Sequence, residues 1–186
     1  MPISTNDMRP GQTLNLDGTL YTITYYQHVK PGKGHAFVKT KLKNINTGAV
    51  TERTFRADER VDLAVLDKRE MQYLYRDDAG FVFMDLETYE QTHVDPDLLG
   101  DAAKFLKDGT TCMVQTYDGR PVGADLPVSM VLEVTDTEPG LKGDRVSGAL
   151  KPATVETGAV VQVPLFVEKG ERIKVDTRTG EYSSRA

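Results

Sequence analysis

The chain has 186 residues, a formal net charge of −5 and a single cysteine, Cys112. This length suits one to three small domains. One cysteine excludes an intramolecular disulfide, and no Cys/His cluster has the spacing of a zinc site. The N-terminus has no basic segment followed by an apolar one, and no apolar run is long enough to cross a membrane. We therefore expect a cytoplasmic protein with no metal, no cofactor and no membrane partner.

Apolar and polar residues alternate along the chain between frequent turn signals, which predicts an all-β protein of short antiparallel strands. The expected strands of a first barrel are 13–16, 20–27, 36–45 and 50–56. The pair Asp17-Gly18 suits a type I′ hairpin turn, because both central residues of that turn need a positive φ angle. The next hairpin displays a loop from His28 to His35, and the barrel ends near Leu63.

A second and a third series of strands follow. Expected strands are 71–75, 81–84, 111–117 and 128–134, the last closing a second barrel, and then 159–164 and 173–176. One helix is expected over 95–107, with Asp95 as N-cap, Pro96 in the first turn and Gly109 after the C-terminus. Both later pieces carry a pattern sized for about five strands, which suits OB-type barrels. The predicted domains are 1–63, 64–126 and 127–186.

The loop at the tip of the second hairpin concentrates positive charge. It reads Lys30-Pro31-Gly32-Lys33-Gly34. Pro31 fixes one φ angle and the glycines on either side of Lys33 permit a tight turn, so Lys33 is expected to be displayed. Between residues 28 and 56 there are seven basic residues and one acid, Glu52. A solvated hairpin would explain an isolated lysine, but this density of one charge favours contact with a polyanion such as RNA.

Catalytic interpretations of the sequence have little support. An exposed lysine such as Lys33 is a cation at neutral pH and a poor nucleophile. Its flanking Gly-x-Gly lacks the third glycine and the strand–helix context of a phosphate loop. Cys112 lies in an alternating strand without a nearby histidine, so a buried structural thiol is expected. The acids Asp77, Asp78 and Asp95 fit turns and a helix cap better than a catalytic pair. We expect no enzyme.

Two stretches of the sequence carry a family resemblance. The first is the loop 30–34 with Ala36-Phe37 and Lys41-Leu42-Lys43-Asn44. The second comprises Lys151-Pro152-Ala153-Thr154, Thr157-Gly158-Ala159, Val163-Pro164-Leu165-Phe166-Val167 and Gly170, and the segments 139–144 and 174–182 extend it. Both resemble the bacterial elongation factor P family, the first at the tip of its N-terminal domain and the second at its C-terminal signature. The resemblance covers nearly the whole chain.

This resemblance implies a fold and a function. The fold would be an N-terminal SH3-like (KOW-type) barrel and two OB-fold barrels in an elongated, tRNA-like L. The function would be that of a translation elongation factor that binds the ribosome beside the peptidyl-tRNA, stimulates peptide bond formation and relieves stalling at consecutive prolines. The ribosome, peptidyl-tRNA, mRNA and a lysine-modifying enzyme are the implied partners of a monomer. From the residues alone, a stand-alone single-stranded nucleic-acid-binding OB protein is the alternative.

The resemblance also assigns roles to individual residues. Lys33 matches the tip residue that reaches the acceptor end of the peptidyl-tRNA and that many members carry in modified form. Its loop is supported by Lys30, Pro31, Gly32 and Gly34. The excess of positive charge over 28–56, and not the resemblance, supplies the candidate contacts to the RNA backbone, which are Lys39, Lys41, Lys43 and Arg56.

A second group of candidates lies toward the C-terminus. Gly143, Asp144 and Arg145 match a loop near the exit-site codon, although Arg145 stands where threonine is common in the family. Tyr182 and Arg185 match residues near the tRNA body. Glycine, aromatic and arginine residues together suit stacking and phosphate contact, but turn chemistry and a frayed terminus explain the same pattern without a ligand.

Overall fold

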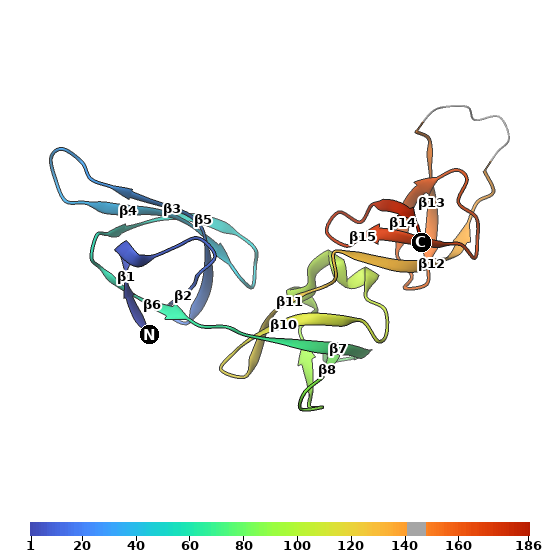
Figure 1. The fold of residues 1–186 in the computed structure, drawn as a ribbon, viewed down its shortest axis with the longest axis horizontal. Coiled ribbons are helices and arrows are strands. Elements are labelled where there is room, and N and C mark those ends of the chain that lie inside the picture. The colour runs from blue at the N-terminus through green and yellow to red at the C-terminus, as the bar shows by residue number, and fades with distance from the viewer. Residues whose placement is uncertain (141–147) are drawn as a thin grey trace. The chain divides into compact units, whose positions relative to one another are not determined.

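The computed structural model describes residues 1–140 and 148–186, which fold mostly into β-strands (Figure 1). The strands form one sheet of six strands and two sheets of five, which confirms the expected all-β class. The chain divides into two compact units. One unit comprises Met1–Arg69 and Val114–Ala124, and the other comprises Glu70–Met113 and Asp125–Ala186. The predicted domain boundaries stay predictions.

The first sheet has the strand order β1-β6-β2-β3-β4-β5. Its strands are β1 (Pro2–Ser4), β2 (Thr13–Leu16), β3 (Thr19–Val29), β4 (Phe37–Asn44), β5 (Val50–Arg56) and β6 (Arg60–Ala64). Asp17 and Gly18 have φ angles of 53° and 88°, so the positive values expected of a type I′ turn are confirmed. The sequence did not predict β1, because three residues are too few to show an alternating pattern.

Alternation along β4 separates the core of this sheet from its outer face. Val38, Thr40 and Leu42 are buried, whereas the lysines between and after them are exposed. The one buried hydroxyl in this series is satisfied, because Thr40 Oγ1 donates to the carbonyl of Arg53 at 2.7 Å. One face of β4 therefore contributes to the core, and the other face presents positive charge to solvent.

The second sheet has the order β11-β10-β7-β8-β9. Its strands are β7 (Asp67–Asp77), β8 (Gly80–Asp85), β9 (Gln91–Val94), β10 (Thr111–Tyr117) and β11 (Arg120–Asp125). The prediction that 128–134 closes this barrel is wrong, because that segment pairs with strands of the third sheet. The strand that pairs with β10 at this edge of the sheet is β11. The sequence did not predict β11, because it contains Pro121 and Gly123 and both residue types normally interrupt strands.

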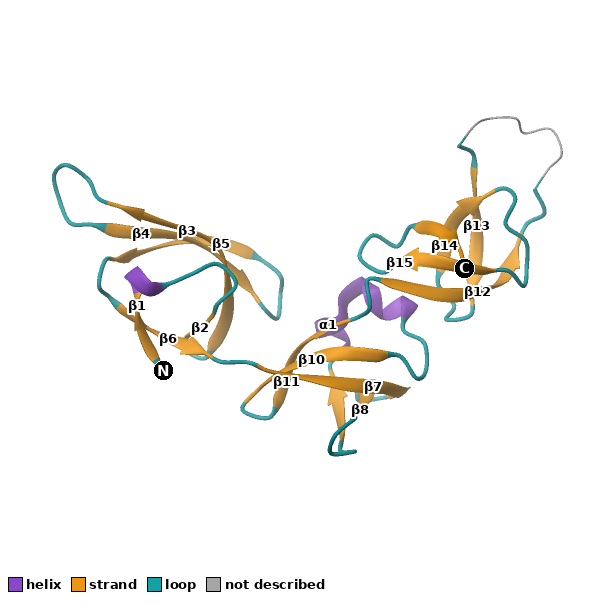
Figure 2. Cartoon of the chain, viewed as in Figure 1, coloured by secondary structure: helices purple, strands orange, loops and turns teal. Residues whose placement is uncertain are grey.

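The predicted helix over 95–107 is shorter than expected. The structure has α1 (Pro96–Leu99) followed by a 3-10 helix, η2 (Gly100–Phe105), as Figure 2 shows in purple. The N-cap is confirmed, because the side chain of Asp95 accepts a hydrogen bond from the Asp97 amide at 2.9 Å. Gly100 has a φ angle of 59° and ends the α-helix. Gly109 follows no helix end, and its amide donates to the Tyr73 carbonyl at 2.8 Å.

The third sheet has the order β14-β13-β12-β15-β16. Its strands are β12 (Ser129–Thr137), β13 (Leu150–Val155), β14 (Val160–Pro164), β15 (Arg172–Asp176) and β16 (Tyr182–Arg185). Neighbouring strands of this sheet pair antiparallel, including β12 with both β13 and β15. The sequence predicted neither β13 nor β16, because proline in β13 and serines in β16 break the apolar alternation.

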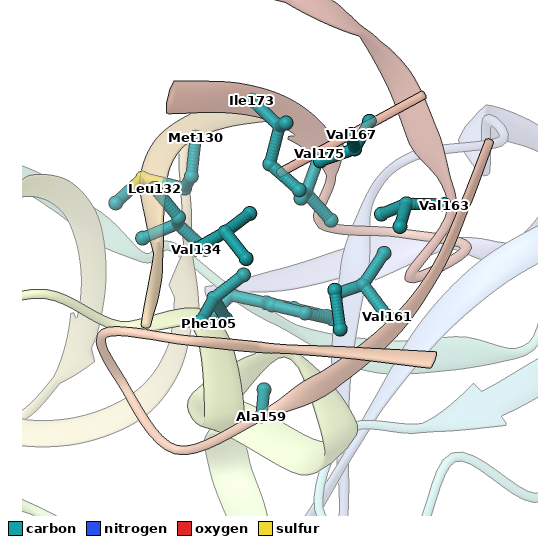
Figure 3. Close-up of a cluster of buried hydrophobic side chains, with 12 residues drawn as sticks. Phe105, Met130, Leu132, Val134, Ala159, Val161, Val163, Val167, Ile173 and Val175 are labelled. Atoms are coloured by element: carbon teal, nitrogen blue, oxygen red, sulfur yellow. The ribbon is translucent and has the colours of Figure 1, made fainter. Parts of the chain in front are cut away.

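The core of the third sheet contains a side chain from outside that sheet. Phe105, the last residue of η2, is 1% exposed and lies among valines, leucine and isoleucine of the third sheet (Figure 3). A Cβ atom added at Gly180 would lie 3.4 Å from the Phe105 ring, so the ring leaves little room there. Polar contacts support the same junction: Thr157 Oγ1 donates to the Lys104 carbonyl at 2.6 Å, and Lys107 pairs with Glu156 at 3.0 Å.

Candidate nucleic-acid interface

The hairpin of β3 and β4 carries the predicted Lys33 loop at its end (Figure 1). Strand β3 ends at Val29 and β4 begins at Phe37, so the loop leaves the sheet between them. Lys33 is exposed, and its side chain has no hydrogen bond or ion pair within residues 1–140 and 148–186. The expected display of this lysine is confirmed. Its role toward RNA stays a prediction.

The two glycines beside Lys33 differ in what the backbone requires. Gly34 has a φ angle of 105°, which L-residues rarely adopt, whereas Gly32 has no such angle and a Cβ atom there would meet nothing within 4 Å. We therefore expect Gly34→Ala to lower the free energy of unfolding by about 1 kcal/mol, whereas Gly32→Ala should raise it by about 0.4 to 1 kcal/mol, because alanine restricts the unfolded chain without straining the loop. Denaturant unfolding of both variants measures this difference. Equal changes would show that the loop relaxes and that φ at position 34 carries no strain.

The predicted phosphate contacts come together on the outer face of the first sheet. Lys39, Lys41 and Lys43 alternate with buried residues along β4 and are all exposed. Arg56 on β5 lies opposite Phe37 of β4, which places it on the same face, since Phe37 has the same parity as these lysines. The structure therefore groups all four predicted backbone contacts on one surface.

Two cross-strand rows line a pocket on this face. In the first row, Tyr25, Lys41 and Glu52 lie side by side on β3, β4 and β5. The Lys41 ammonium lies 5.8 Å from the centre of the Tyr25 ring and 3.9 Å from the Glu52 carboxylate. In the second row, Gln27, Lys39 and Thr54 lie side by side in the same way.

Sequence reasoning missed Tyr25 and Gln27 as surface residues of this site. Strict alternation from the buried Ile23 would place Tyr25 in the core. The register of β3 against β4 shifts between Ile23 and Tyr25, so Thr24 is an extra residue and the side chains after it change face. Tyr26, not Tyr25, then packs against the core. No residue type in this segment marks the bulge.

The C-terminal candidates lie in the other compact unit. Tyr182 is half-buried and packs against the core of the third sheet. The Arg185 guanidinium lies 4.5 Å from the centre of the Phe166 ring and 3.4 Å from a Glu171 carboxylate oxygen. The alternative of a frayed terminus is wrong, because 182–185 form the paired strand β16. Gly143, Asp144 and Arg145 lie outside the described residues.

The residues considered for catalysis have structural explanations. Cys112 is buried, and burial raises the pKa of its thiol to about 11, so it is not a nucleophile at neutral pH. A hydrogen bond from His93 at 2.8 Å holds the pKa of Asp77 below its ordinary value, and Asp77 also accepts the amides of its own turn. Asp95 caps α1. The interpretation of these acids as turn and cap residues is confirmed.

None of the helices described is long and apolar enough to cross a bilayer.

Three family models match successive parts of the chain. They are described as the KOW-like domain of elongation factor P at residues 4–61, its OB domain at 66–124 and its C-terminal domain at 130–185. Elongation factor P of Acidothermus cellulolyticus is 55% identical over 183 residues, which cover 98% of this chain and 98% of that protein. Elongation factor P of Moorella thermoacetica is 56% identical over 184 residues, covering 99% and 100%.

Two solved structures share the fold at low sequence identity. Eukaryotic translation initiation factor 5A from Methanococcus jannaschii aligns with a TM-score of 0.55 at 22% identity, covering 68% of this chain and 92% of that one. A translation initiation factor of the eIF-5A family from Naegleria fowleri aligns with a TM-score of 0.54 at 18% identity, covering 68% and 98%. At such identity the likeness concerns the fold, which agrees with the KOW-like and OB domains.

Proposed function

Because this chain belongs to the elongation factor P family and is a translation elongation factor, we propose that it binds the ribosome beside the peptidyl-tRNA and relieves stalling at consecutive prolines. The observation that carries the proposal is the exposed Lys33 at the end of a hairpin whose outer face is basic. A polyanion is the natural partner of such a surface.

Lys33 acts by position in this proposal and transfers no proton. Proline is a constrained and poor participant in peptide transfer. Ordering the acceptor end of the peptidyl-tRNA lowers the entropic part of the barrier, and a tenfold gain in rate needs only about 1.4 kcal/mol. A lysine at a loop tip can reach RNA phosphate without a change in the fold, and its exposure also admits a lysine-modifying enzyme.

The lysines of β4 hold the hairpin against the RNA backbone in the same proposal. Tyr182, Arg185 and the loop of Gly143, Asp144 and Arg145 make the second contact, with tRNA and mRNA. Arg185 keeps its guanidinium oriented through Phe166 and Glu171. A planar donor held in this way loses little conformational entropy when it binds phosphate.

The charge of β4 is tested through the salt dependence of binding. Reversing Lys41 and Lys43 to glutamate should weaken ribosome binding and reduce the slope of log K against log salt by about 0.7 to 0.9 for each phosphate that is no longer neutralised. Filter binding at several salt concentrations measures this. Lys68 on β7 and Lys169 in the turn before β15 are exposed lysines outside the first sheet, and their reversal to glutamate is the matched control. An unchanged slope in the first pair would remove Lys41 and Lys43 from the RNA contacts.

The function itself is tested in reconstituted translation. Added protein should raise the peptide yield from a message that encodes Pro-Pro-Pro and leave the peptide yield from a proline-free message unchanged. A message with the three prolines separated by alanines controls for proline content. Binding to RNA without any effect on the Pro-Pro-Pro message would contradict the proposal and favour a stand-alone nucleic-acid-binding protein.

A further inference from the structure

The pocket on the outer face of the first sheet offers more than positive charge. We infer that it binds one unpaired ribonucleotide, whose base stacks on Tyr25 and whose ribose 2′-hydroxyl donates to Glu52. This inference rests on the proposed contact of the same face with RNA and names the part of the RNA that the pocket takes. The lining residues that matter for it are Tyr25, Gln27, Lys39, Lys41 and Glu52.

Tyr25 provides the stacking surface. Its side chain is 44% exposed although the residue lies within a paired strand. Its hydroxyl donates to Gln27 Oε1 at 2.9 Å, which fixes the orientation of the ring. The Lys41 ammonium lies 5.8 Å from the ring centre. An oriented aromatic ring beside a cation is the combination on which proteins stack single-stranded bases.

Gln27 and Lys39 provide donors beside the ring. Because Gln27 Oε1 accepts from Tyr25, the amide nitrogen keeps two N–H donors for a ligand. Lys39 lies next to Gln27 across the strand pair and is exposed. These donors suit the acceptor oxygens of a phosphate and a ribose, which lie within one nucleotide of a stacked base.

Glu52 makes the pocket selective. It is the one acid among residues 28–56, and it lies beside Lys41 where it would repel a phosphate. A carboxylate accepts hydrogen bonds and cannot donate them when ionised. The 2′-hydroxyl of RNA is a donor that DNA lacks, so Glu52 favours ribose over deoxyribose. Glu52 would weaken a surface that bound phosphates alone, because it repels them and pairs with Lys41.

An unpaired nucleotide fits these groups better than a duplex does. The bases of a helix are stacked on each other, so their faces cannot reach Tyr25. Duplex RNA would contact the lysines through phosphates and make no contact with the face of Tyr25 or with Glu52. The tyrosine and the acid therefore point to a splayed-out base.

The full-length protein and synthetic oligonucleotides test this inference. Fluorescence anisotropy compares an eight-nucleotide single-stranded RNA, the DNA of the same sequence and a blunt RNA duplex. Tyr25→Leu should weaken RNA binding about tenfold, as expected for the loss of one stacked base. Tyr75 on β7 is a matched control, because its side chain is 49% exposed and belongs to the second sheet; Tyr75→Leu should bind as the unchanged protein does. Photo-cross-linking with 4-thiouridine RNA should place the adduct on Tyr25.

Glu52→Leu removes the hydrogen-bond acceptor together with the charge, and it separates recognition of ribose from simple repulsion. If Glu52 accepts the 2′-hydroxyl, the preference for RNA over DNA falls about fivefold in this variant. If Glu52 only repels phosphate, RNA and DNA both bind more tightly by the same factor and the inference is overturned. Glu90→Leu, at an exposed acid of the other compact unit, controls for the change in net charge. Equal binding of the duplex and the single strand would also overturn it.

The outcomes distinguish this inference from the proposed function. A cross-link at Tyr25 in a protein that fails to relieve proline stalling would keep the pocket and remove the function. Relief of stalling that is undiminished by Tyr25→Leu, together with unchanged RNA affinity, would keep the function and remove the pocket.

Discussion

Lys33→Ala is expected to abolish the relief of stalling on a Pro-Pro-Pro message and to leave the fold intact. The Lys33 side chain has no hydrogen bond or ion pair with the part of the chain that the structure describes, so truncating it removes no stabilising contact. Surface substitutions of this kind change the free energy of unfolding by less than about 0.5 kcal/mol. The peptide yield from the Pro-Pro-Pro message and the denaturant midpoint of the variant measure the two effects.

Lys33→Arg and Lys169→Ala complete this experiment. Arginine keeps the charge but not the primary amine, so it separates phosphate attraction from a modified lysine. Lys169 is exposed in the turn before β15 and controls for the loss of one surface lysine. Full relief of stalling by Lys33→Ala would contradict the positional mechanism, independent of the results for the other two variants.

Phe105→Ala is expected to cost about 3 to 5 kcal/mol of stability, the usual range for removing a buried aromatic side chain. The ring is 1% exposed and lies among the buried side chains of the third sheet. Alanine would leave a cavity in that core, and the segment that carries Phe105 would lose its main apolar partner. Denaturant unfolding followed by circular dichroism measures the loss.

Hydrogen exchange locates the effect of Phe105→Ala. Amides of β12 and β15 should lose protection together with those of η2, because one ring joins them. Phe166→Ala is the matched control, since Phe166 is 55% exposed and its removal leaves no cavity. A loss of less than about 1 kcal/mol for Phe105→Ala would mean that the core closes without the ring.

The strands that the sequence predicts with the correct bounds lie next to clear turn signals. Gly48 precedes 50–56 and Asp118-Gly119 follow 111–117, and these segments are β5 and β10 with the same bounds. Where alternation fails, the prediction fails for a physical reason. Pro121 and Gly123 concealed β11, and Gly100 ended a helix whose apolar pattern continues to Leu106. Pairing with the neighbouring strand β10 overrides the low strand propensity of proline and glycine in β11, and a positive φ angle at Gly100 ends the helix.

The candidate site was predictable only in part, because turn residues and alternation mark some of its residues and not others. Proline and glycine mark the Lys33 loop directly, and alternation places three lysines of β4 on one face. Tyr25 was not predictable, because a bulge at Thr24 changes the face of every later residue in β3 and leaves no trace in residue types. The pocket exists because this bulge turns Tyr25 and Gln27 toward the face that carries the lysines of β4.

The position of Phe105 has a consequence for synthesis of the chain. Phe105 is made before every strand of the third sheet, whose last strand begins at Tyr182. At about 5 to 20 residues per second, synthesis of the chain from Phe105 to Tyr182 takes about 4 to 15 seconds, and the core around the ring is incomplete during that time. During that interval an aromatic side chain is exposed on a nascent chain, where hydrophobic surface favours aggregation. A protein that we propose to speed translation through prolines therefore depends, in its own production, on how quickly the strands of the third sheet follow Phe105.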